Sequence, residues 1–233
     1  MDPLLAVALL GVAAGGLAQS VTGLGFALVA APGLIALLGP REGVALVVLL
    51  GTIVSGLSLL GQWRLVRVRD GLSLLVPTLL ATPLAAVLVS GLDTRVLAAA
   101  AGVGVLLGVA ALWRGVRWRG LASVPGAIGT GITSALLNVI GGVGGPPVAL
   151  YASNADWPVE QARSTLQAFF LVQGVATIAV VGLALPTPAM LVALVAGTLL
   201  GIWLAPRMPA AAARHAVLAV AAFGGVALIL GNR

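Results

Sequence analysis

Apolar residues run along this chain in eight long stretches, which charged residues and prolines separate. None of the stretches alternates polar and apolar positions as a half-buried strand does, so we expect helices. A helix needs about 20 residues to cross a bilayer, and six of the stretches fit one crossing each. The expected spans are residues 43–60, 72–92, 96–113, 164–185, 189–205 and 216–230.

The two remaining stretches, residues 4–38 and 121–151, are too long for one straight crossing and too short for two. Each has a polar, glycine-rich interruption near its middle: QSVTGLG at 19–25 and NVIGGVGGPP at 138–147. An interruption predicts two arms of about 13–15 residues each, which favours a re-entrant hairpin over two short crossings.

The two interruptions also align with each other. An offset of 119 residues places Gln19 on Asn138, Gly23 on Gly142 and Gly25 on Gly144. The chain therefore reads as a duplication, in which a broken hairpin and three spans occur twice. We expect one repeat over residues 1–117 and a second over residues 118–233.

Arginine positions predict how these segments cross the membrane. If each broken segment returns to the side it came from, nine arginines share one side: Arg64, Arg67, Arg69, Arg114, Arg117, Arg119, Arg163, Arg207 and Arg214. Only Arg41, Arg95 and Arg233 then lie opposite, whereas single crossings would divide the arginines seven to five. The positive-inside rule favours the first arrangement, with the nine arginines cytoplasmic and the N-terminus outside.

This topology predicts an inverted repeat. Each half crosses the membrane three times, so the halves run in opposite directions and their hairpins come from opposite faces. The two hairpin tips can then meet near the bilayer midplane. The fold class that we expect is an all-α, polytopic membrane protein built from two inverted halves.

Composition agrees with a membrane protein and excludes several other classes. The 233 residues are 61% hydrophobic and 8% charged, with a mean hydropathy of +1.18, against about 25% charged residues in soluble domains. The net charge of +6 comes from arginines that orient helices, so we expect no nucleic-acid partner. There is no cysteine, and carboxylates and the single histidine stand at segment ends, where they form no evident proton relay, metal site or catalytic group.

The chemistry that we expect lies at the two interruptions. Each returning arm begins at about Phe26 or Pro146, and its first N–H groups and positive dipole end make a neutral anion site. Glycines allow the substrate to approach closely, so Gly→Val at Gly23 or Gly142 should abolish transport. Arg163 is the candidate cation that attracts an anion from the cytoplasm; the alternative is that it only anchors the helix under the positive-inside rule. The full set of candidate substrate-binding residues is Gln19, Ser20, Thr22, Gly23, Gly25, Phe26, Asn138, Gly141, Gly142, Gly144, Gly145, Arg163 and Gln173.

Other small and polar residues have a structural interpretation. We expect three glycine pairs to pack helices together: Gly11 with Gly15, Gly104 with Gly108, and Gly197 with Gly201. We expect the hydroxyls of Ser55, Ser58, Thr78 and Thr82 to bond mainly to helix backbone.

Three features resemble the sulfite exporter TauE/SafE family: the stretches VTGLGFALVAAP and NVIGGVGGPP, the repeated four-segment layout, and the glycine-rich third segment of each half, VAGTLLGIWLAPRM in the second. The resemblance covers nearly the whole chain. It implies a bacterial inner-membrane transporter of sulfite or of organosulfonates, such as sulfoacetate or taurine-derived acids. Many members have two glycines where the first stretch here continues with Phe26, which can alter the size of the pocket.

The function that we expect is therefore a secondary transporter that exports small sulfur-containing anions. The alternatives are a passive anion channel of the same architecture, a carrier of other small organic anions and, from a different class, a membrane enzyme or assembly factor. We expect a small anionic substrate and a lipid bilayer as partners and no cofactor, and we keep a homodimer open.

Overall fold

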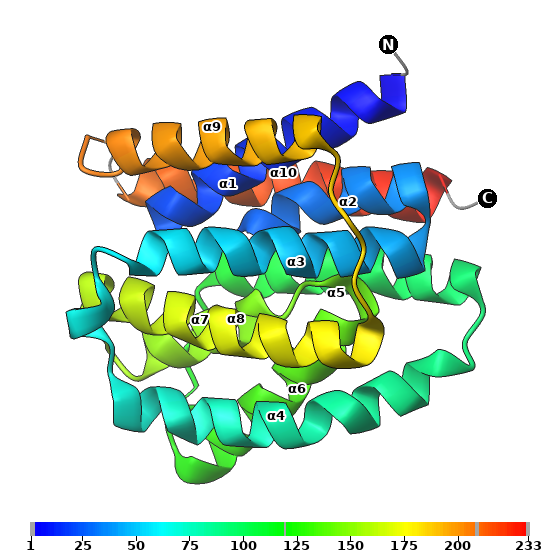
Figure 1. Ribbon diagram of the computed structural model, residues 1–233. Helices are drawn as coiled ribbons and strands as arrows, with labels where there is room; N and C mark the ends of the chain where they lie inside the picture. Colours follow the sequence, from blue (N-terminus) through cyan, green and yellow to red (C-terminus); the bar gives the residue numbers. More distant parts are fainter. Residues whose placement is uncertain (1–2, 119, 208–209, 232–233) are drawn as a thin grey trace.

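The computed structural model describes residues 3–118, 120–207 and 210–231, and the chain folds into a bundle of α-helices (Figure 1). The helices are α1 (Pro3–Thr22), α2 (Phe26–Leu38), α3 (Pro40–Leu59), α4 (Val68–Ser90), α5 (Thr94–Arg114), α6 (Val124–Gly141), α7 (Gly145–Asn154), α8 (Val159–Val181), α9 (Pro188–Leu204) and α10 (Ala210–Gly231), with a short 3-10 helix at Trp63–Leu65. Six of them, α1, α3, α4, α5, α6 and α8, are long and apolar enough to cross a membrane.

Both overlong segments are broken, as the sequence predicted. The first break, residues 23–25, separates α1 from α2, and the second break, residues 142–144, separates α6 from α7. The predicted arm lengths were wrong, because the arms have 20 and 13 residues in the first hairpin and 18 and 10 in the second. The polar residues Gln19 and Asn138 remain helical, and each helix ends only after them.

A glycine in the left-handed conformation ends each outgoing arm. Gly23 has φ 83° and Gly142 has φ 70°, which glycine adopts without the steric cost that other residues incur. The Gly23 N–H donates to the Gln19 carbonyl, and the Gly142 N–H donates to the Asn138 carbonyl, at 2.8 Å in both cases. These are helix C-caps of the αL type.

Each pair of arms forms an antiparallel hairpin. In the first, a Cβ at Gly15 would lie 2.9 Å from the Phe26 carbonyl oxygen, and Gly33 lies beside Ala8. The two hairpins open toward opposite ends of the bundle in Figure 1: the turn from α2 to α3 lies at one end and the turn from α7 to α8 at the other. Both termini of the chain lie at the same end as the α2–α3 turn.

The end with the α3–α4, α7–α8 and α9–α10 turns is the arginine-rich end (Figure 1). The chain places Arg64, Arg67, Arg69, Arg114, Arg117 and Arg207 in or beside its loops, and Arg41 and Arg95 at the opposite end. Arg119 and Arg233 lie outside the described residues, and the side chain of Arg214 is not described.

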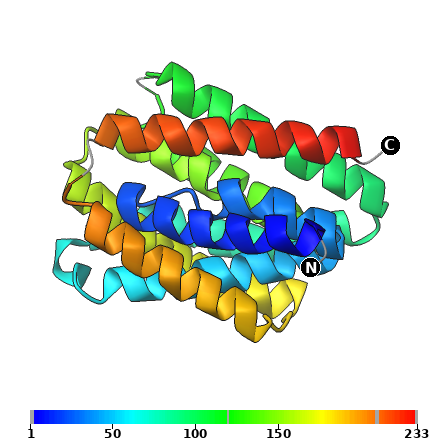
Figure 2. The same ribbon diagram turned by 90° about the horizontal axis from the view of Figure 1, so that it is seen from above.

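The helices interleave in a regular way. The α1–α2 hairpin packs against α9 and α10, the α6–α7 hairpin packs against α4 and α5, and α3 packs against α8. Figure 2 shows α1 lying between α9 and α10. The predicted glycine pairs do pack helices: Gly11 and Gly15 face α2, Gly104 and Gly108 face α6 and α7, and Gly197 and Gly201 face α1.

The helix bounds differ most from prediction at the fourth expected span. The sequence predicted residues 164–185, whereas α8 covers Val159–Val181. Gly182 has φ 98° and ends the helix, and residues 183–187 are not helical. The apolar stretch continues through Leu185, so hydrophobicity alone places the end too late.

Candidate functional site

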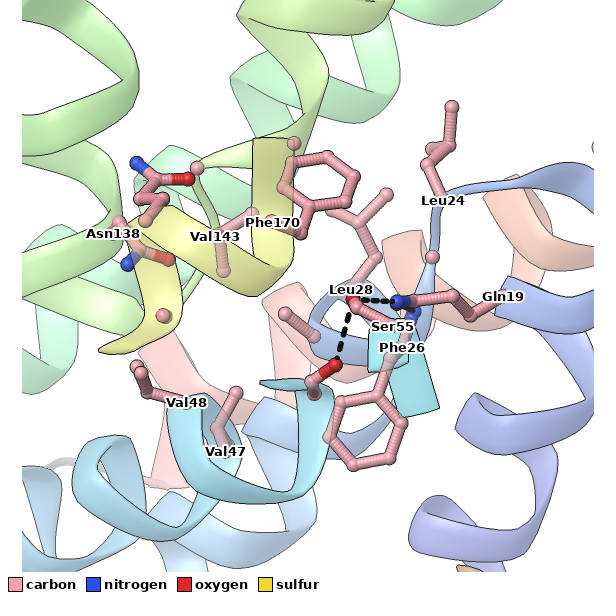
Figure 3. A pocket seen from close by; sticks show the side chains of 18 of the residues that line it. Gln19, Leu24, Phe26, Leu28, Val47, Val48, Ser55, Asn138, Val143 and Phe170 are labelled. Carbon is pink, nitrogen blue, oxygen red and sulfur yellow. Dashed lines mark hydrogen bonds between the residues drawn. The ribbon is translucent and has the colours of Figure 1, made fainter. Parts of the chain in front are cut away.

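The two breaks border one small cavity inside the bundle, the central cavity, with a volume of about 50 Å³. Figure 3 shows Gln19, Leu24 and Phe26 of the first hairpin on one side and Asn138 and Val143 of the second on the other. Helices α3 and α8 supply the remaining walls. The lining residues are Gln19, Leu24, Gly25, Phe26, Ala27, Leu28, Val47, Val48, Gly51, Thr52, Ser55, Asn138, Gly142, Val143, Gly144, Gly145, Pro146, Phe170, Gln173 and Gly174.

Eight of the thirteen candidate residues line this cavity: Gln19, Gly25, Phe26, Asn138, Gly142, Gly144, Gly145 and Gln173. They come from α1, α2, α6, α7, α8 and the two breaks, so the fold brings together residues up to 154 positions apart. The other five candidates lie elsewhere.

Two of those five are packing residues. Ser20 is buried, donates to the Gly16 carbonyl at 2.9 Å and faces Gly201 of α9. Gly141 faces Ala101 of α5, whose Cβ lies 2.9 Å from the position of an added Cβ. Each stands one residue from a residue that lines the central cavity, Gln19 or Gly142, and this step turns it toward a neighbouring helix instead.

The remaining three lie on the arginine-rich side of the first break. Thr22 and Arg163 line a separate cavity there. Gly23 lies against the Arg163 side chain, with an added Cβ only 2.9 Å from Arg163 Cγ. None of the three is among the residues that line the central cavity.

The side chain of Gln19 holds the first break in shape. Its Nε2 donates to Ser55 Oγ at 2.8 Å and to Gln167 Oε1 at 3.0 Å. Its Oε1 accepts the first N–H of α2, that of Phe26, at 3.3 Å. We expected Gln19 to donate to the substrate, but its amide already bonds to protein groups on both sides.

A second set of polar side chains holds the second break. Gln173 Nε2 donates to Ser134 Oγ at 3.0 Å, and Ser134 Oγ donates to the Gly144 carbonyl at 2.7 Å. Asn138 Nδ2 donates to Thr177 Oγ1 at 2.9 Å. Since α8 supplies both Gln167 and Gln173, this helix supports both breaks.

Sequence reasoning missed Gln167, which also donates to the Gln19 and Gly23 carbonyls at 3.4 Å. A signal was present, because a second glutamine six residues before Gln173 is as costly to bury. For Ser55, Thr78 and Thr82 the predicted bonds to helix carbonyls are confirmed. The Ser58 hydroxyl has no partner among the described residues.

None of the described charged side chains lines the central cavity, so its polarity comes from neutral groups. The first helical bond of α2 joins the Val29 N–H to the Gly25 carbonyl, and the N–H groups of Ala27 and Leu28 find no acceptor among the described residues. Both residues line the cavity, at the positive end of the α2 dipole. In α7 the prolines at 146 and 147 lack an N–H, so the second break supplies fewer donors.

These donors favour a small anion over a cation, because free N–H groups at a helix N-terminus bind negative charge. Among the described residues there is no group of three or more His, Cys, Asp or Glu that could hold a metal ion.

Membrane-length helices and two broken helices that meet at a buried, uncharged cavity define a polytopic α-helical membrane protein of the broken-helix type. The chain matches the sulfite exporter TauE/SafE family over residues 7–228 and belongs to that family. It is therefore a multi-pass membrane protein of a family of transporters for sulfur-containing anions. No curated protein and no solved structure matches the chain.

Proposed function

We propose that the protein is a secondary transporter that exports small sulfur-containing anions, sulfite or organosulfonates, across the bacterial inner membrane. One observation carries this proposal: both breaks face a single cavity whose unpaired donors are backbone N–H groups of α2. In our interpretation the anion binds there, between the two breaks, and is held without a buried positive charge.

The size of the central cavity favours the smallest members of this substrate class. A buried water needs about 10–15 Å³ of such space, so a cavity of about 50 Å³ holds roughly three or four water-sized groups. Sulfite has four non-hydrogen atoms and matches that size. Sulfoacetate and taurine are larger and would require the cavity to widen.

We also propose that the two halves, residues 1–117 and 118–233, are inverted repeats. The helix starts support this interpretation. Helix α7 begins 119 residues after α2, and α8 begins 119 residues after α3. The contacts between helices follow the same correspondence. The packing of α1 against α9 matches that of α6 against α4, and the packing of α2 against α10 matches that of α7 against α5.

The level of the breaks along α3 supports a site near the middle of the bundle. Gly51 and Ser55 contact the first hairpin at Phe26 and Gln19. Val47 contacts the second break at Gly142. Since α3 runs from Pro40 to Leu59, the two breaks lie on either side of its middle.

Purified protein in liposomes tests the transport function. We expect saturable efflux of sulfite that is accelerated by sulfite on the opposite side, as counterflow requires of a carrier. If sulfite passes without saturation or without counterflow, the protein is a channel. Liposomes that retain sulfite as well as protein-free liposomes do would overturn the proposal.

Gly145 offers a sharper test of the site than Gly23 or Gly142. A valine at Gly23 or Gly142 would strain a left-handed backbone and meet Arg163 or Val47, so it would disturb the fold as well. Gly145 is not left-handed, and an added Cβ meets only Phe170, at 3.4 Å or more. We expect Gly145→Leu to fill the cavity and abolish sulfite transport while the protein inserts normally, and Gly145→Ala to retain most of the transport.

A further inference from the structure

A second cavity lies beside the first break, toward the arginine-rich end, and we call it the arginine-side cavity. Its volume is about 240 Å³, and its walls include Thr22, Leu24, Trp157, Arg163 and Leu166. Leu24 is the residue that lines both this cavity and the central cavity. The two spaces are therefore neighbours that share Leu24 as part of their walls.

The cation of this cavity forms no ion pair in the described part of the chain, although the Glu160 carboxylate on the same helix interacts with it electrostatically. Arg163 is partly buried, and its Nη2 donates to the Val21 carbonyl at 2.6 Å. Its Nε is buried and has no hydrogen-bond partner in the described part of the chain. The ion pairs found among described residues join Arg67 to Asp70 and Arg117 to Asp156, and none involves Arg163. A partly buried charge with an unpartnered Nε and no ion pair among the described residues costs free energy, which an anion bound here would offset.

The opposite end of the bundle has a related cavity with a different cation. This far-side cavity, about 150 Å³, is lined by Arg41, which is exposed and donates to the Ser90 carbonyl at 3.1 Å. Pro40, Val44 and Ile140 line it as well. By the 119-residue offset, Pro40 corresponds to Val159, Val44 to Arg163 and Ile140 to Val21. All three counterparts line the arginine-side cavity. The position of Arg163 is thus taken by valine, and the far-side cavity shares no lining residue with the central cavity.

The residues at the two boundaries differ as well. Leu24 is non-helical and stands between Gly23 and Gly25, with φ values of 83° and 123°. Figure 3 shows the Leu24 and Phe26 side chains on opposite sides of the break. Its counterpart by the 119-residue offset, Val143, is buried in the core and lines the central cavity alone. Leu24 therefore borders both the central cavity and the arginine-side cavity, whereas no lining residue is common to the central cavity and the far-side cavity.

We propose that the arginine-side cavity is a second anion site, in series with the central cavity, in which Arg163 binds the sulfur oxyanion before Leu24 moves aside. This inference rests on the proposed function. In the far-side cavity Val44 takes the position of Arg163, and the cation there, Arg41, is exposed to solvent, which screens its charge. The transporter therefore binds its substrate more tightly from the arginine-rich face than from the opposite face.

Transport kinetics from each face test the second site. Wild-type protein in liposomes, sorted by orientation, should show a lower half-saturating sulfite concentration at the arginine-rich face. Arg163→Gln should raise that concentration by about ten-fold or more, the effect of losing a charge-assisted hydrogen bond, and leave the opposite face unchanged. Arg69→Gln is the matched control, since Arg69 is exposed at the same end and lines neither cavity. It should change neither value.

A binding measurement separates failure of this inference from failure of the proposed function. In detergent, calorimetry with sulfite should detect one site in Gly145→Leu, whose central cavity is filled, and that site should vanish in Gly145→Leu/Arg163→Gln. Arg163→Lys keeps the charge and should retain binding, which guards against a general loss of fold. Two results would overturn the second site alone. One is that wild type transports sulfite but shows no binding that depends on Arg163. The other is that Arg163→Gln raises the half-saturating sulfite concentration equally at both faces. Arg163-dependent binding without transport would instead overturn the proposed function.

Discussion

At the scale of single residues, the breaks depend on amide side chains that bond to the protein itself. Gln19 connects the end of α1, the start of α2, Ser55 of α3 and Gln167 of α8. Four helices or helix ends thus meet at one side chain that is 4% exposed. A buried amide with all of its partners fixes a single arrangement, because any other would leave polar groups unpaired. The residue keeps the first break in a shape that exposes the N–H groups of Ala27 and Leu28.

Two serines on α3 give a direct test of this support. Ser55 accepts from Gln19 and donates to the Gly51 carbonyl, whereas the buried Ser58 hydroxyl has no partner in the described chain. We expect Ser55→Ala to destabilise the protein by about 1 kcal/mol, a typical value for a hydrogen bond inside a membrane protein. Ser58→Ala should leave stability unchanged or raise it. Reversible unfolding in detergent, followed by tryptophan fluorescence, measures both, and equal losses would contradict this role of Ser55.

Local sequence predicted where the chain breaks but not what supports the breaks. Glycines such as Gly23 and Gly142 end a helix through their own backbone, so a short window of sequence shows them. The bond from Gln19 to Gln167 spans 148 positions, and only the packing of α8 against the hairpins brings it about. For the same reason the sequence did not show that Ser20 and Gly141 lie outside the lining of the central cavity, since a shift of one residue turns a helical position away from it.

At the scale of helices, glycines set how closely α9 approaches the first hairpin. An added Cβ at Gly201 would lie 2.7 Å from the Leu17 carbonyl oxygen, and one at Gly197 would collide with the Ala13 carbonyl. Helices in membranes gain stability from such close contact, because lipid offers no hydrophobic drive for association. The α1–α9 contact therefore holds the long arm that positions the first break.

The same substitution at two helical glycines tests this contact. Gly197→Val in α9 must push α1 away and should destabilise the protein by about 1–3 kcal/mol, the usual cost of overpacking. Gly129→Val in α6 adds a side chain where no atom lies within 4 Å, and should change stability by less than about 0.5 kcal/mol. Unfolding midpoints of both variants in one detergent provide the comparison. A Gly197 variant as stable as the Gly129 variant would show that α9 does not depend on close approach.

At the scale of the whole molecule, the predicted topology can be tested without altering native thiols, because the chain has no cysteine. Gly61 lies at the arginine-rich end, and Gly91 lies in the α4–α5 turn at the other; both are exposed, with open space around an added Cβ. We expect Gly61→Cys to react with a membrane-impermeant maleimide only from the cytoplasmic side and Gly91→Cys only from outside, as the positive-inside rule requires. The reverse pattern would invert the orientation, and labelling of both from one side would refute the topology.

The charges of the whole molecule also predict what drives export. The described carboxylates Glu42, Asp70, Asp93, Asp156 and Glu160 and the single histidine, His215, line neither the central cavity nor the arginine-side cavity. Asp2 lies outside the described residues. In the described part of the chain we therefore find no side chain at these cavities that would carry a coupling proton.

An anion needs no coupling ion to leave the cell. The inside-negative potential favours its export by about 2.3 kcal/mol per charge for each 100 mV, which is about fifty-fold in concentration ratio. We expect transport to be electrogenic and to proceed without a proton or sodium gradient. Liposomes loaded with sulfite, with the potential set by potassium and valinomycin, should release it faster as the interior becomes more negative. The Gly145→Leu variant provides the background leak under the same potentials. Efflux that ignores the potential but follows an imposed pH or sodium gradient would contradict electrogenic export and would indicate that a proton or cation crosses with the anion.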